Sequence, residues 1–235
     1  MQVVLLAGGL GTRLAEETDT RPKPMVNIGP IPILHHIINY FVKFNHSHFL
    51  IAGGYKVEMI SEYFSNYADT FGPLVTIKVI DTGLETATGG RLLRLRPHLD
   101  SEFLMTYGDG LSNVDLGKVV SYHRTHQRLA TVTAVRLPAR FGTIRIQNGV
   151  VTSFSEKDPQ DVGWINGGFF CLNSKVLDYI PSFETSFEGL PLKTLVEAEE
   201  LRAFEHEGWW HPMDTLRDKR ELEKLWETDR APWLV

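Results

Sequence analysis

The sequence lacks the features that would place it among membrane, disulfide-stabilised or nucleic-acid-binding proteins. It contains a single cysteine, Cys171, so no internal disulfide can form, and the apolar residues around Cys171 indicate a core position rather than a nucleophile. No apolar run approaches the roughly 18 to 20 residues that span a bilayer. No basic-then-apolar signal segment precedes the first apolar run. We therefore expect no membrane association and a cytoplasmic location.

An excess of positive charge is also missing. The formal net charge is −5 and the pI is about 6.0, so the chain has no overall basic field for nucleic acid. With 43% apolar and 23% charged residues in a chain of 235, the composition is that of a globular protein with a sizeable core. Any phosphate binding must therefore come from locally placed groups.

Such groups occur near the start of the chain. Residues 3–6 form an apolar run typical of a strand, and Gly-Gly-Leu-Gly follows at 8–11. Consecutive glycines let backbone N–H groups approach a phosphate closely. Arg13 and Lys23 add positive charge, and the prolines on either side of Lys23 stiffen its loop. The stretch is neither a P-loop nor the dinucleotide fingerprint. It predicts a nucleotide triphosphate site, although the glycines alone are equally compatible with a simple turn.

Apolar periodicity predicts alternating strands and helices in the first part of the chain. We expect strands at 3–6, 49–52, 74–80, 103–107 and 130–135, and helices at 32–42, 56–64, 89–95 and 114–126. This alternation argues for a largely parallel sheet covered on both faces. Further along, Asn148-Gly149 predicts a hairpin turn, followed by a strand at 165–172 and helices at 174–180, 190–198 and 216–226. We predict one α/β domain, with a nucleotide-binding half at 1–137 and an acceptor-binding half at 138–235.

The histidine pairs His35-His36 and His123-x-x-His126 have no cysteine or glutamate partners at the spacing of a zinc site. We expect these side chains on helix surfaces.

Two aspartates are candidate metal ligands. Asp109 follows the strand at 103–107, and the carboxyl ends of strands in open α/β sheets face the ligand. A carboxylate beside a triphosphate is favourable if a divalent cation lies between them, and Mg²⁺ binds carboxylate, phosphate and water oxygens. Taken alone, Asp109 could simply shape a Gly-Asp-Gly turn. Asp214 lies just before a predicted helix, where an N-cap is the simpler interpretation.

Two further groups of polar residues are candidates for binding the rest of the substrates. Lys157 could bind a phosphate, and Glu156 and Asn166 are of types that hydrogen-bond sugar hydroxyls. The Thr-Gly-Gly-Arg sequence at 88–91 could place a base or ribose near a helix N-terminus. Each is individually compatible with an ordinary surface or turn position, and Thr88 with a helix cap.

Taken together and in this order, the motifs resemble those of the sugar-1-phosphate nucleotidylyltransferases, and within them the glucose-1-phosphate cytidylyltransferase branch. The resemblance covers almost the whole chain. It rests on Gly-Gly-Leu-Gly-Thr-Arg-Leu at 8–14, Lys-Pro-Met at 23–25, Asp-Thr-Gly at 81–83, Thr-Gly-Gly-Arg-Leu at 88–92, Tyr-Gly-Asp-Gly at 107–110, Arg-Phe-Gly at 140–142, Glu-Lys at 156–157, Ile-Asn-Gly-Gly-Phe-Phe at 165–170, Pro-Met-Asp-Thr-Leu-Arg-Asp-Lys at 212–219 and Ala-Pro-Trp at 231–233.

The resemblance implies a Rossmann-like nucleotide-diphospho-sugar transferase fold with a mixed, mostly parallel sheet. It implies transfer of a cytidylyl group from CTP to a sugar 1-phosphate, with Mg²⁺ held by Asp109 and Asp214, and it favours the metal role of Asp214 over the cap. Arg13, Lys23 and Asp109 are then catalytic. The implied nucleotide-binding residues are Leu6, Ala7, Gly8, Gly9, Gly11, Thr12, Arg13, Lys23, Thr88, Gly89, Gly90 and Gly108, and the implied acceptor-binding residues are Gly142, Glu156, Lys157, Asn166 and Gly167.

Two departures from the family pattern bear on the acceptor and on assembly. Asp158 stands where the family usually has proline. The segment between Tyr67 and Asp81 is short, and in the family this segment is associated with subunit contacts. A homo-oligomer is expected, but the sequence does not fix its size. The alternatives are a cytidylyltransferase for another phosphorylated sugar or polyol, a metal-dependent glycosyltransferase, and a non-catalytic nucleotide-sugar sensor.

Overall fold

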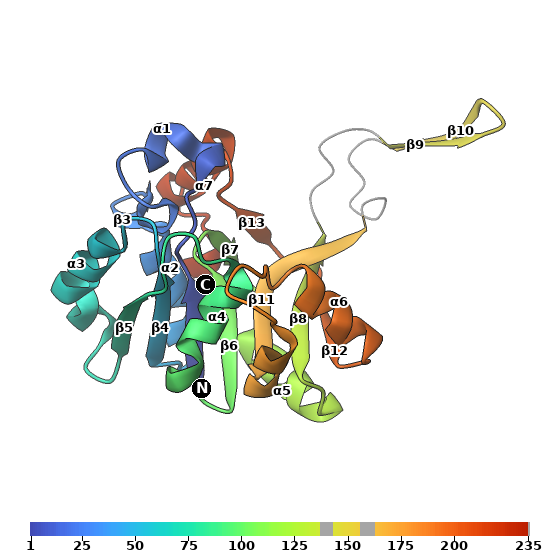
Figure 1. The fold of residues 1–235 in the computed structure, drawn as a ribbon. Helices are drawn as coiled ribbons and strands as arrows, with labels where there is room; N and C mark the ends of the chain where they lie inside the picture. Colours follow the sequence, from blue (N-terminus) through green and yellow to red (C-terminus); the bar gives the residue numbers. More distant parts are fainter. Residues whose placement is uncertain (137–142, 156–162, 235) are drawn as a thin grey trace.

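The computed structural model describes residues 1–136, 143–155 and 163–234, with side chains except at 143–146 and 154–155. Its centre is a seven-stranded sheet in the order β12-β8-β11-β6-β1-β4-β5 (Figure 1). The strands are β1 (Gln2–Leu6), β4 (His48–Gly53), β5 (Thr76–Asp81), β6 (Glu102–Tyr107), β8 (Ala130–Arg136), β11 (Trp164–Asn173) and β12 (Leu201–His206).

Most neighbours in this sheet are parallel. Strand β1 pairs in parallel with β4 and β6, β4 pairs in parallel with β5, and β12 pairs in parallel with β8. Strand β11 is antiparallel to both β6 and β8. The predicted mixed, mostly parallel sheet is therefore confirmed. Smaller two-stranded pairs are β2 (Asn27–Ile28) with β3 (Ile31–Pro32), β7 (Gly110–Ser112) with β13 (Trp210–Pro212), and β9 (Thr143–Gln147) with β10 (Val150–Ser155).

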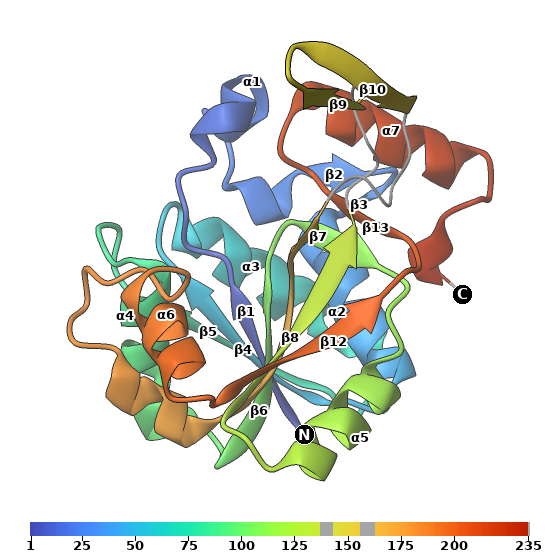
Figure 2. The same cartoon turned by 90° about the vertical axis from the view of Figure 1, so that its right-hand side faces the viewer.

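Helices cover both faces of the sheet, as Figure 2 shows for α2 and α5 on one side and α4 and α6 on the other. Because side chains of a strand alternate between faces, Val3 and Leu5 pack on the first side while Val4 and Leu6 pack on the second. The helices are α1 (Ala15–Thr18), α2 (Ile33–Lys43), α3 (Val57–Tyr67), α4 (Thr88–Leu95), α5 (Leu116–His126), α6 (Leu190–Glu197) and α7 (Leu216–Glu227).

The helix starts differ from expectation at two candidate site residues. Helix α7 is capped by Thr215, whose hydroxyl accepts from the Asp218 backbone while the Asp218 carboxylate accepts from the Thr215 backbone. This capping box leaves the Asp214 side chain outside the cap, so the N-cap interpretation of Asp214 is wrong. Ala87 precedes α4, and the Thr88 side chain does not cap it. Both side chains are therefore available to the region beyond the strand ends.

The expectation that the histidine pairs lie on helix surfaces is wrong for three of the four side chains. His35, His36 and His123 are 7%, 1% and 4% exposed. Their helices pack closely on the sheet, and each imidazole finds a polar partner: the Tyr63 hydroxyl, the Ile28 carbonyl and the Thr131 hydroxyl, respectively. A neutral imidazole with a satisfied hydrogen bond is tolerated in a core, whereas a charged one is not.

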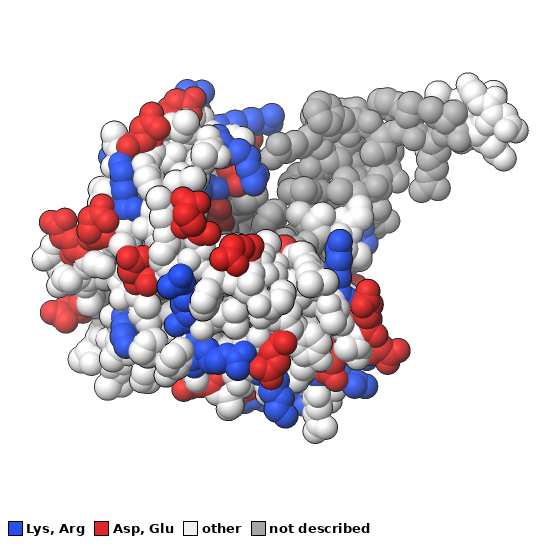
Figure 3. Space-filling view, in the orientation of Figure 1, with Lys and Arg blue, Asp and Glu red and all other residues white. Residues whose placement is uncertain are grey.

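Charge is spread over the surface rather than gathered into one field. On the described part of the face in Figure 3, basic and acidic side chains are interspersed. Within the described residues, no helix is both long and apolar enough to cross a bilayer.

Burial of His35 should make stability depend on pH. Burial lowers the pKa of His35 from 6.5 to about 4. The unfolded chain therefore takes up a proton below pH 6.5 that the folded chain refuses until about pH 4, and the free energy of unfolding falls by about 1.4 kcal/mol per pH unit across that window. We expect urea unfolding between pH 7.5 and 4.5 to show a weaker pH dependence of the free energy of unfolding in His35→Gln. The difference from the wild type should correspond to the uptake of about one proton fewer on unfolding. His48→Gln, at the exposed start of β4, is the control. An unchanged slope in His35→Gln would refute the assignment.

Candidate active site

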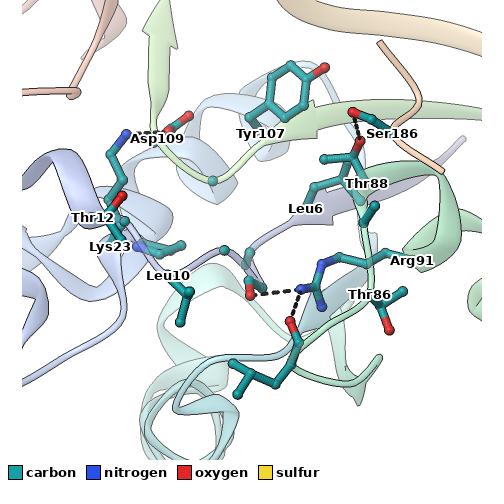
Figure 4. A pocket seen from close by; sticks show the side chains of 18 of the residues that line it. Leu6, Leu10, Thr12, Lys23, Thr86, Thr88, Arg91, Tyr107, Asp109 and Ser186 are labelled. Carbon is teal, nitrogen blue, oxygen red and sulfur yellow. Dashed lines mark hydrogen bonds and ion pairs between the residues drawn. The ribbon is translucent and has the colours of Figure 1, made fainter. Parts of the chain in front are cut away.

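A cavity of about 610 Å³ opens at the carboxyl ends of β1 and β6 (Figure 4). It collects segments from distant parts of the chain: the glycine loop, the Lys23 loop, the segment before α4, the end of β6 and the approach to α7. The lining residues are Leu6, Ala7, Gly8, Gly9, Leu10, Gly11, Thr12, Arg13, Lys23, Pro24, Leu84, Glu85, Thr86, Ala87, Thr88, Arg91, Tyr107, Gly108, Asp109, Ser186 and Asp214.

Close packing behind the first loop requires glycine at positions 8 and 11, whereas a Cβ on Gly9 would meet nothing within 4 Å. A Cβ on Gly8 would overlap the Arg91 guanidinium. Gly11 has φ +67°, and a Cβ there would lie 2.9 Å from the Thr18 side chain. Gly108 is equally restricted, since its Cβ would lie 2.9 Å from Pro24. The loop therefore presents bare backbone to the cavity because side chains from three other segments press against its back.

Lys23 is the electrostatic centre of the cavity. Its Nζ lies 2.6 Å from Asp109 Oδ2 and 2.6 Å from Asp214 Oδ1, and its side chain is only 11% exposed. Burial lowers the pKa of Lys23, but the charges and hydrogen bonds of Asp109 and Asp214 outweigh burial and raise the pKa above its usual value. The ammonium is therefore fully charged, and two carboxylates converge on one cation position.

Arg13 extends this cluster toward solvent. Its Nη1 donates to Asp214 Oδ2 at 2.9 Å, while 77% of its side chain is exposed. Asp214 thus receives one buried and one exposed cation. An exposed, flexible guanidinium can move to meet an anionic ligand at little cost, because surface ion pairs contribute only weakly to stability.

Arg91 holds the floor of the cavity together. It is 4% exposed, and its guanidinium donates to the carbonyls of Gly8 and Gly53 and to the Thr82 hydroxyl, at 2.6 to 2.9 Å. It also donates to the Gly83 and Leu84 carbonyls, at 2.9 and 3.3 Å. Burial lowers the pKa of Arg91, and the charge of Asp81 partly opposes that change. The arginine therefore fixes the glycine loop against the ends of β4 and β5.

Thr88 lies at the cavity wall, but the two glycines after it face away from the cavity. A Cβ on Gly89 would lie 2.6 Å from the Thr185 carbonyl oxygen, and one on Gly90 would overlap the Phe183 backbone. Neither Gly89 nor Gly90 is among the lining residues. These glycines allow the segment 183–187 to pack directly on the first turn of α4.

The described acceptor candidates lie beside the cavity rather than in its lining. Asn166 accepts from the Gly168 backbone at 2.8 Å, and its Nδ2 lies 3.5 Å from the Tyr107 hydroxyl. The Gly167 carbonyl accepts from Trp210 Nε1 at 2.7 Å. Gly142, Glu156 and Lys157 are outside the described residues. The structure thus brings together the metal candidates and all nucleotide candidates except Gly89 and Gly90, and it places Asn166 within reach of Tyr107.

Two other groups of metal-ligating side chains occur among the described residues. Glu102, His123 and Cys171 converge at the opposite end of the sheet, but Arg124 already pairs with Glu102 at 2.7 Å, and burial raises the pKa of the Cys171 thiol to about 12. His211, Asp218 and Glu221 form the second group, in which Asp218 is occupied by the cap of α7. The convergence of Asp109 and Asp214 on a buried cation is the arrangement that suits a hard divalent ion.

A family model for nucleotidyl transferases matches residues 2–219 of the chain. The chain belongs to the nucleotidyl transferase family. It is 46% identical to a glucose-1-phosphate cytidylyltransferase of Salmonella typhi, in an alignment that covers 99% of this chain and 98% of the relative. It is 45% identical to that of Salmonella typhimurium over the same shares.

Among solved structures, the chain resembles HddC from Yersinia pseudotuberculosis complexed with GMP-PN. The TM-score is 0.74 at 25% identity, covering 96% of this chain and 99% of that one. The predicted family and the predicted α/β fold are therefore confirmed, and the chain is a nucleotidyltransferase. The alignment with the Salmonella typhi relative spans 253 positions, more than the 235 residues of this chain, so the relative carries residues that this chain lacks.

Sequence reasoning missed several cavity residues. Arg91 and Tyr107 lie within motifs that the sequence analysis recognised, but it assigned binding roles only to neighbouring residues of those motifs. A buried arginine within an apolar helix face was a usable signal for Arg91, because such a group needs many acceptors. Ser186 and Glu188 carried no signal, since they lie in a polar loop that reaches the site only through the packing of 183–187 on α4.

Replacing Arg91 with lysine should destabilise the fold and loosen the loop. A lysine cannot reproduce the planar fork of donors and leaves several buried carbonyls unsatisfied. We expect the free energy of unfolding of Arg91→Lys, measured in urea, to fall by about 2 to 4 kcal/mol. Arg94→Lys, on the exposed face of the same helix, should change it by less than about 0.5 kcal/mol. Equal effects of the two substitutions would contradict the structural role of Arg91.

Proposed function

We propose that this chain transfers a cytidylyl group from CTP to α-D-glucose 1-phosphate, giving CDP-glucose and pyrophosphate. The observation that carries the proposal is the 46% identity to a glucose-1-phosphate cytidylyltransferase over nearly the full length of both chains. The cavity supports it, because it combines a glycine loop, two cations and two converging carboxylates at the end of a parallel strand pair. These are the groups that transfer between two anionic phosphates requires.

In the proposed reaction, a phosphate oxygen of the sugar phosphate attacks the α-phosphorus of CTP in line, and pyrophosphate leaves. Both substrates are anions, so catalysis consists mainly of alignment and charge neutralisation. Lys23, buried next to Asp109, is assigned to neutralise the α-phosphate. Arg13, whose side chain is exposed, is assigned to the departing pyrophosphate. The reaction needs no covalent enzyme nucleophile. The thiol of Cys171 is buried in the core and is assigned no part in it.

Nucleotidyltransferases of this family generally use a divalent metal, and we propose Mg²⁺ held by Asp109 and Asp214. The fit rests on the donor set: both carboxylates already converge on one cation, the Lys23 ammonium, at 2.6 Å. Carboxylate oxygens are ligands that Mg²⁺ prefers, with phosphate oxygens and water. When bound, the ion would neutralise phosphate charge and orient the triphosphate.

The remaining assignments follow from the motifs. The nucleotide is assigned to 1–137, with Leu6 to Gly11 and Gly108 contributing backbone and Thr88 at the cavity wall. Gly89 and Gly90 are no longer assigned to it, because they face the segment 183–187 and the Gly90 N–H donates to the Thr185 carbonyl. The acceptor is assigned to 138–235. Lys157 is proposed to hold its phosphate, and Gly142, Glu156, Asn166 and Gly167 to contact the sugar. We further propose that the functional protein is a homo-oligomer located in the cytoplasm. The 3₁₀ helix Ala68–Phe71 and a short turn join α3 to β5, where the family has a longer segment.

Pyrophosphate release measures the proposed reaction directly. The protein is incubated with each of the four NTPs and a panel of sugar 1-phosphates, with Mg²⁺ present. We expect CTP with glucose 1-phosphate to give the highest kcat/KM. Release of a nucleoside diphosphate from a nucleotide sugar instead of pyrophosphate from CTP would identify a glycosyltransferase.

Removal of the central cation should disable the enzyme. Lys23→Ala should lower kcat/KM by about 3 kcal/mol or more in transition-state free energy, which is the order found on removing one electrostatic stabiliser. Lys118→Ala, whose ammonium is 75% exposed on α5, is the matched control. Thermal unfolding of both variants separates lost catalysis from lost folding. Near-wild-type activity in Lys23→Ala would reduce Lys23 to a loop residue.

Asp109→Asn should raise the Mg²⁺ concentration needed for half-maximal activity at least about tenfold, because one charged ligand of the ion is lost. Asp115→Asn, an exposed cap of α5, should leave that concentration unchanged. An unaltered metal requirement in Asp109→Asn would remove Asp109 from the metal site.

A further inference from the structure

Three hydroxyl groups at the wall of the cavity share one carboxylate. The Tyr107 hydroxyl donates to Glu188 Oε1. Glu188 Oε2 accepts from the Thr88 hydroxyl at 2.6 Å and from the Ser186 hydroxyl at 2.6 Å. Tyr107, Thr88 and Ser186 all line the cavity, whereas Glu188 is not among the lining residues and is exposed to solvent. Figure 4 shows these three lining side chains grouped on the side of the cavity away from Lys23.

The carboxylate fixes the direction of these hydrogen bonds. An ionised carboxylate only accepts, so each hydroxyl must turn its hydrogen toward Glu188. Desolvation raises the pKa of Glu188, but the hydrogen bonds from Ser186, Thr88 and Tyr107 outweigh it and lower the pKa below its usual value. Burial and the Glu188 charge raise the pKa of Tyr107, so its phenol keeps its proton. Each hydroxyl oxygen therefore keeps its two lone pairs as acceptor positions. One on Thr88 accepts from the Phe187 N–H at 2.9 Å, and one on Tyr107 faces the Asn166 amide at 3.5 Å, which leaves one acceptor position on each of these two oxygens.

We propose that Glu188 is a positioning residue that turns Tyr107, Thr88 and Ser186 into a wall of hydrogen-bond acceptors for the hydroxyl groups of the acceptor sugar. Such a wall favours a ligand rich in hydroxyl donors and disfavours phosphate, which has none to offer at neutral pH. This assignment rests on the proposed function, because it names how the same cavity selects its second substrate. It moves the Thr88 hydroxyl, which the sequence motif grouped with the nucleotide, to the acceptor sugar.

The location of the wall supports the sugar rather than the triphosphate. Tyr107 directly precedes Gly108 and Asp109, so its side chain leaves β6 next to the carboxylate that faces the reacting phosphate. The acceptor sugar and the ribose of CTP are both attached to a reacting phosphate and both carry hydroxyl donors, so a contact with the acceptor half of the chain must distinguish them. The Asn166 amide lies 3.5 Å from the Tyr107 hydroxyl, which joins the wall to the half of the chain assigned to the acceptor.

The decisive variant is Glu188→Gln, which keeps the side-chain shape but introduces an NH₂ donor and removes the charge. The hydroxyls are then free to turn, and the wall loses its acceptor character. We expect KM for glucose 1-phosphate to rise about tenfold, with KM for CTP changed by less than about twofold. The preference in kcat/KM for glucose 1-phosphate over its deoxy analogues should fall at least about threefold. In a Tyr107→Phe background, the same substitution should have a smaller effect, because one partner is already missing.

Glu184→Gln is the matched control, since Glu184 lies on the same segment and is exposed; it should leave all these values unchanged. Equal rises in both KM values for Glu188→Gln would reduce Glu188 to a structural support and overturn the proposal. A changed preference for CTP over UTP, with sugar selection intact, would assign the wall to the base and overturn it as well. KM values and a sugar preference unchanged from the wild type in Glu188→Gln would also overturn the proposal. Failure of the proposed function is a separate result, because the wild-type protein would then form no CDP-glucose.

Discussion

The site depends on the pairing of one buried ammonium with two carboxylates. Lys23 joins Asp109 and Asp214 across sequence separations of 86 and 191 residues, so this interaction ties the first loop, the end of β6 and the approach to α7 into one cavity. Burying such a charge without partners would cost several kcal/mol. With both partners present the ammonium stays charged, and each acid stays beside the cavity instead of turning to solvent. The capping box of α7 permits this, because Thr215 and Asp218 satisfy the helix start and leave Asp214 to face Lys23.

The two buried cations of the cavity serve different purposes, and their chemistry explains why. Arg91 presents a rigid fork of donors, and every described acceptor around it is a backbone carbonyl or a hydroxyl. Such a group fixes backbone geometry but has no carboxylate partner to exchange. Lys23 is a compact charge held by side chains that a ligand can displace. Arg91 therefore determines the shape of the glycine loop, and Lys23 determines the charge that a phosphate meets there.

The sequence allowed the regular elements to be predicted because their periodicity is local. The continuous apolar run at 3–6, which is buried on both faces of the sheet, and the Asn148-Gly149 turn are readable without tertiary context, and Asn148 and Gly149 indeed have positive φ. What could not be predicted depends on packing across the chain. His35 and His36 were expected at a surface, but Tyr63 and Phe71 pack on His35, and Trp226 and Trp233 pack on His36. Glu188 could not be found at all, because only the close approach allowed by Gly90 brings its loop to Tyr107 and Thr88.

The charge balance of the cavity explains why a divalent cation fits the proposed reaction. Arg13 and Lys23 carry two positive charges, which Asp109 and Asp214 cancel. A cavity neutralised in this way offers little attraction to a triphosphate and a sugar phosphate together, because Lys23 and Arg13 already have an anion at contact distance. A cation that engages the two carboxylates leaves the charges of Lys23 and Arg13 uncompensated and available to phosphate oxygens. In the proposed reaction, the ion pairs of Lys23 and Arg13 with the two acids thus hold both cations at the cavity, and a metal ion on the acids would release them to phosphate.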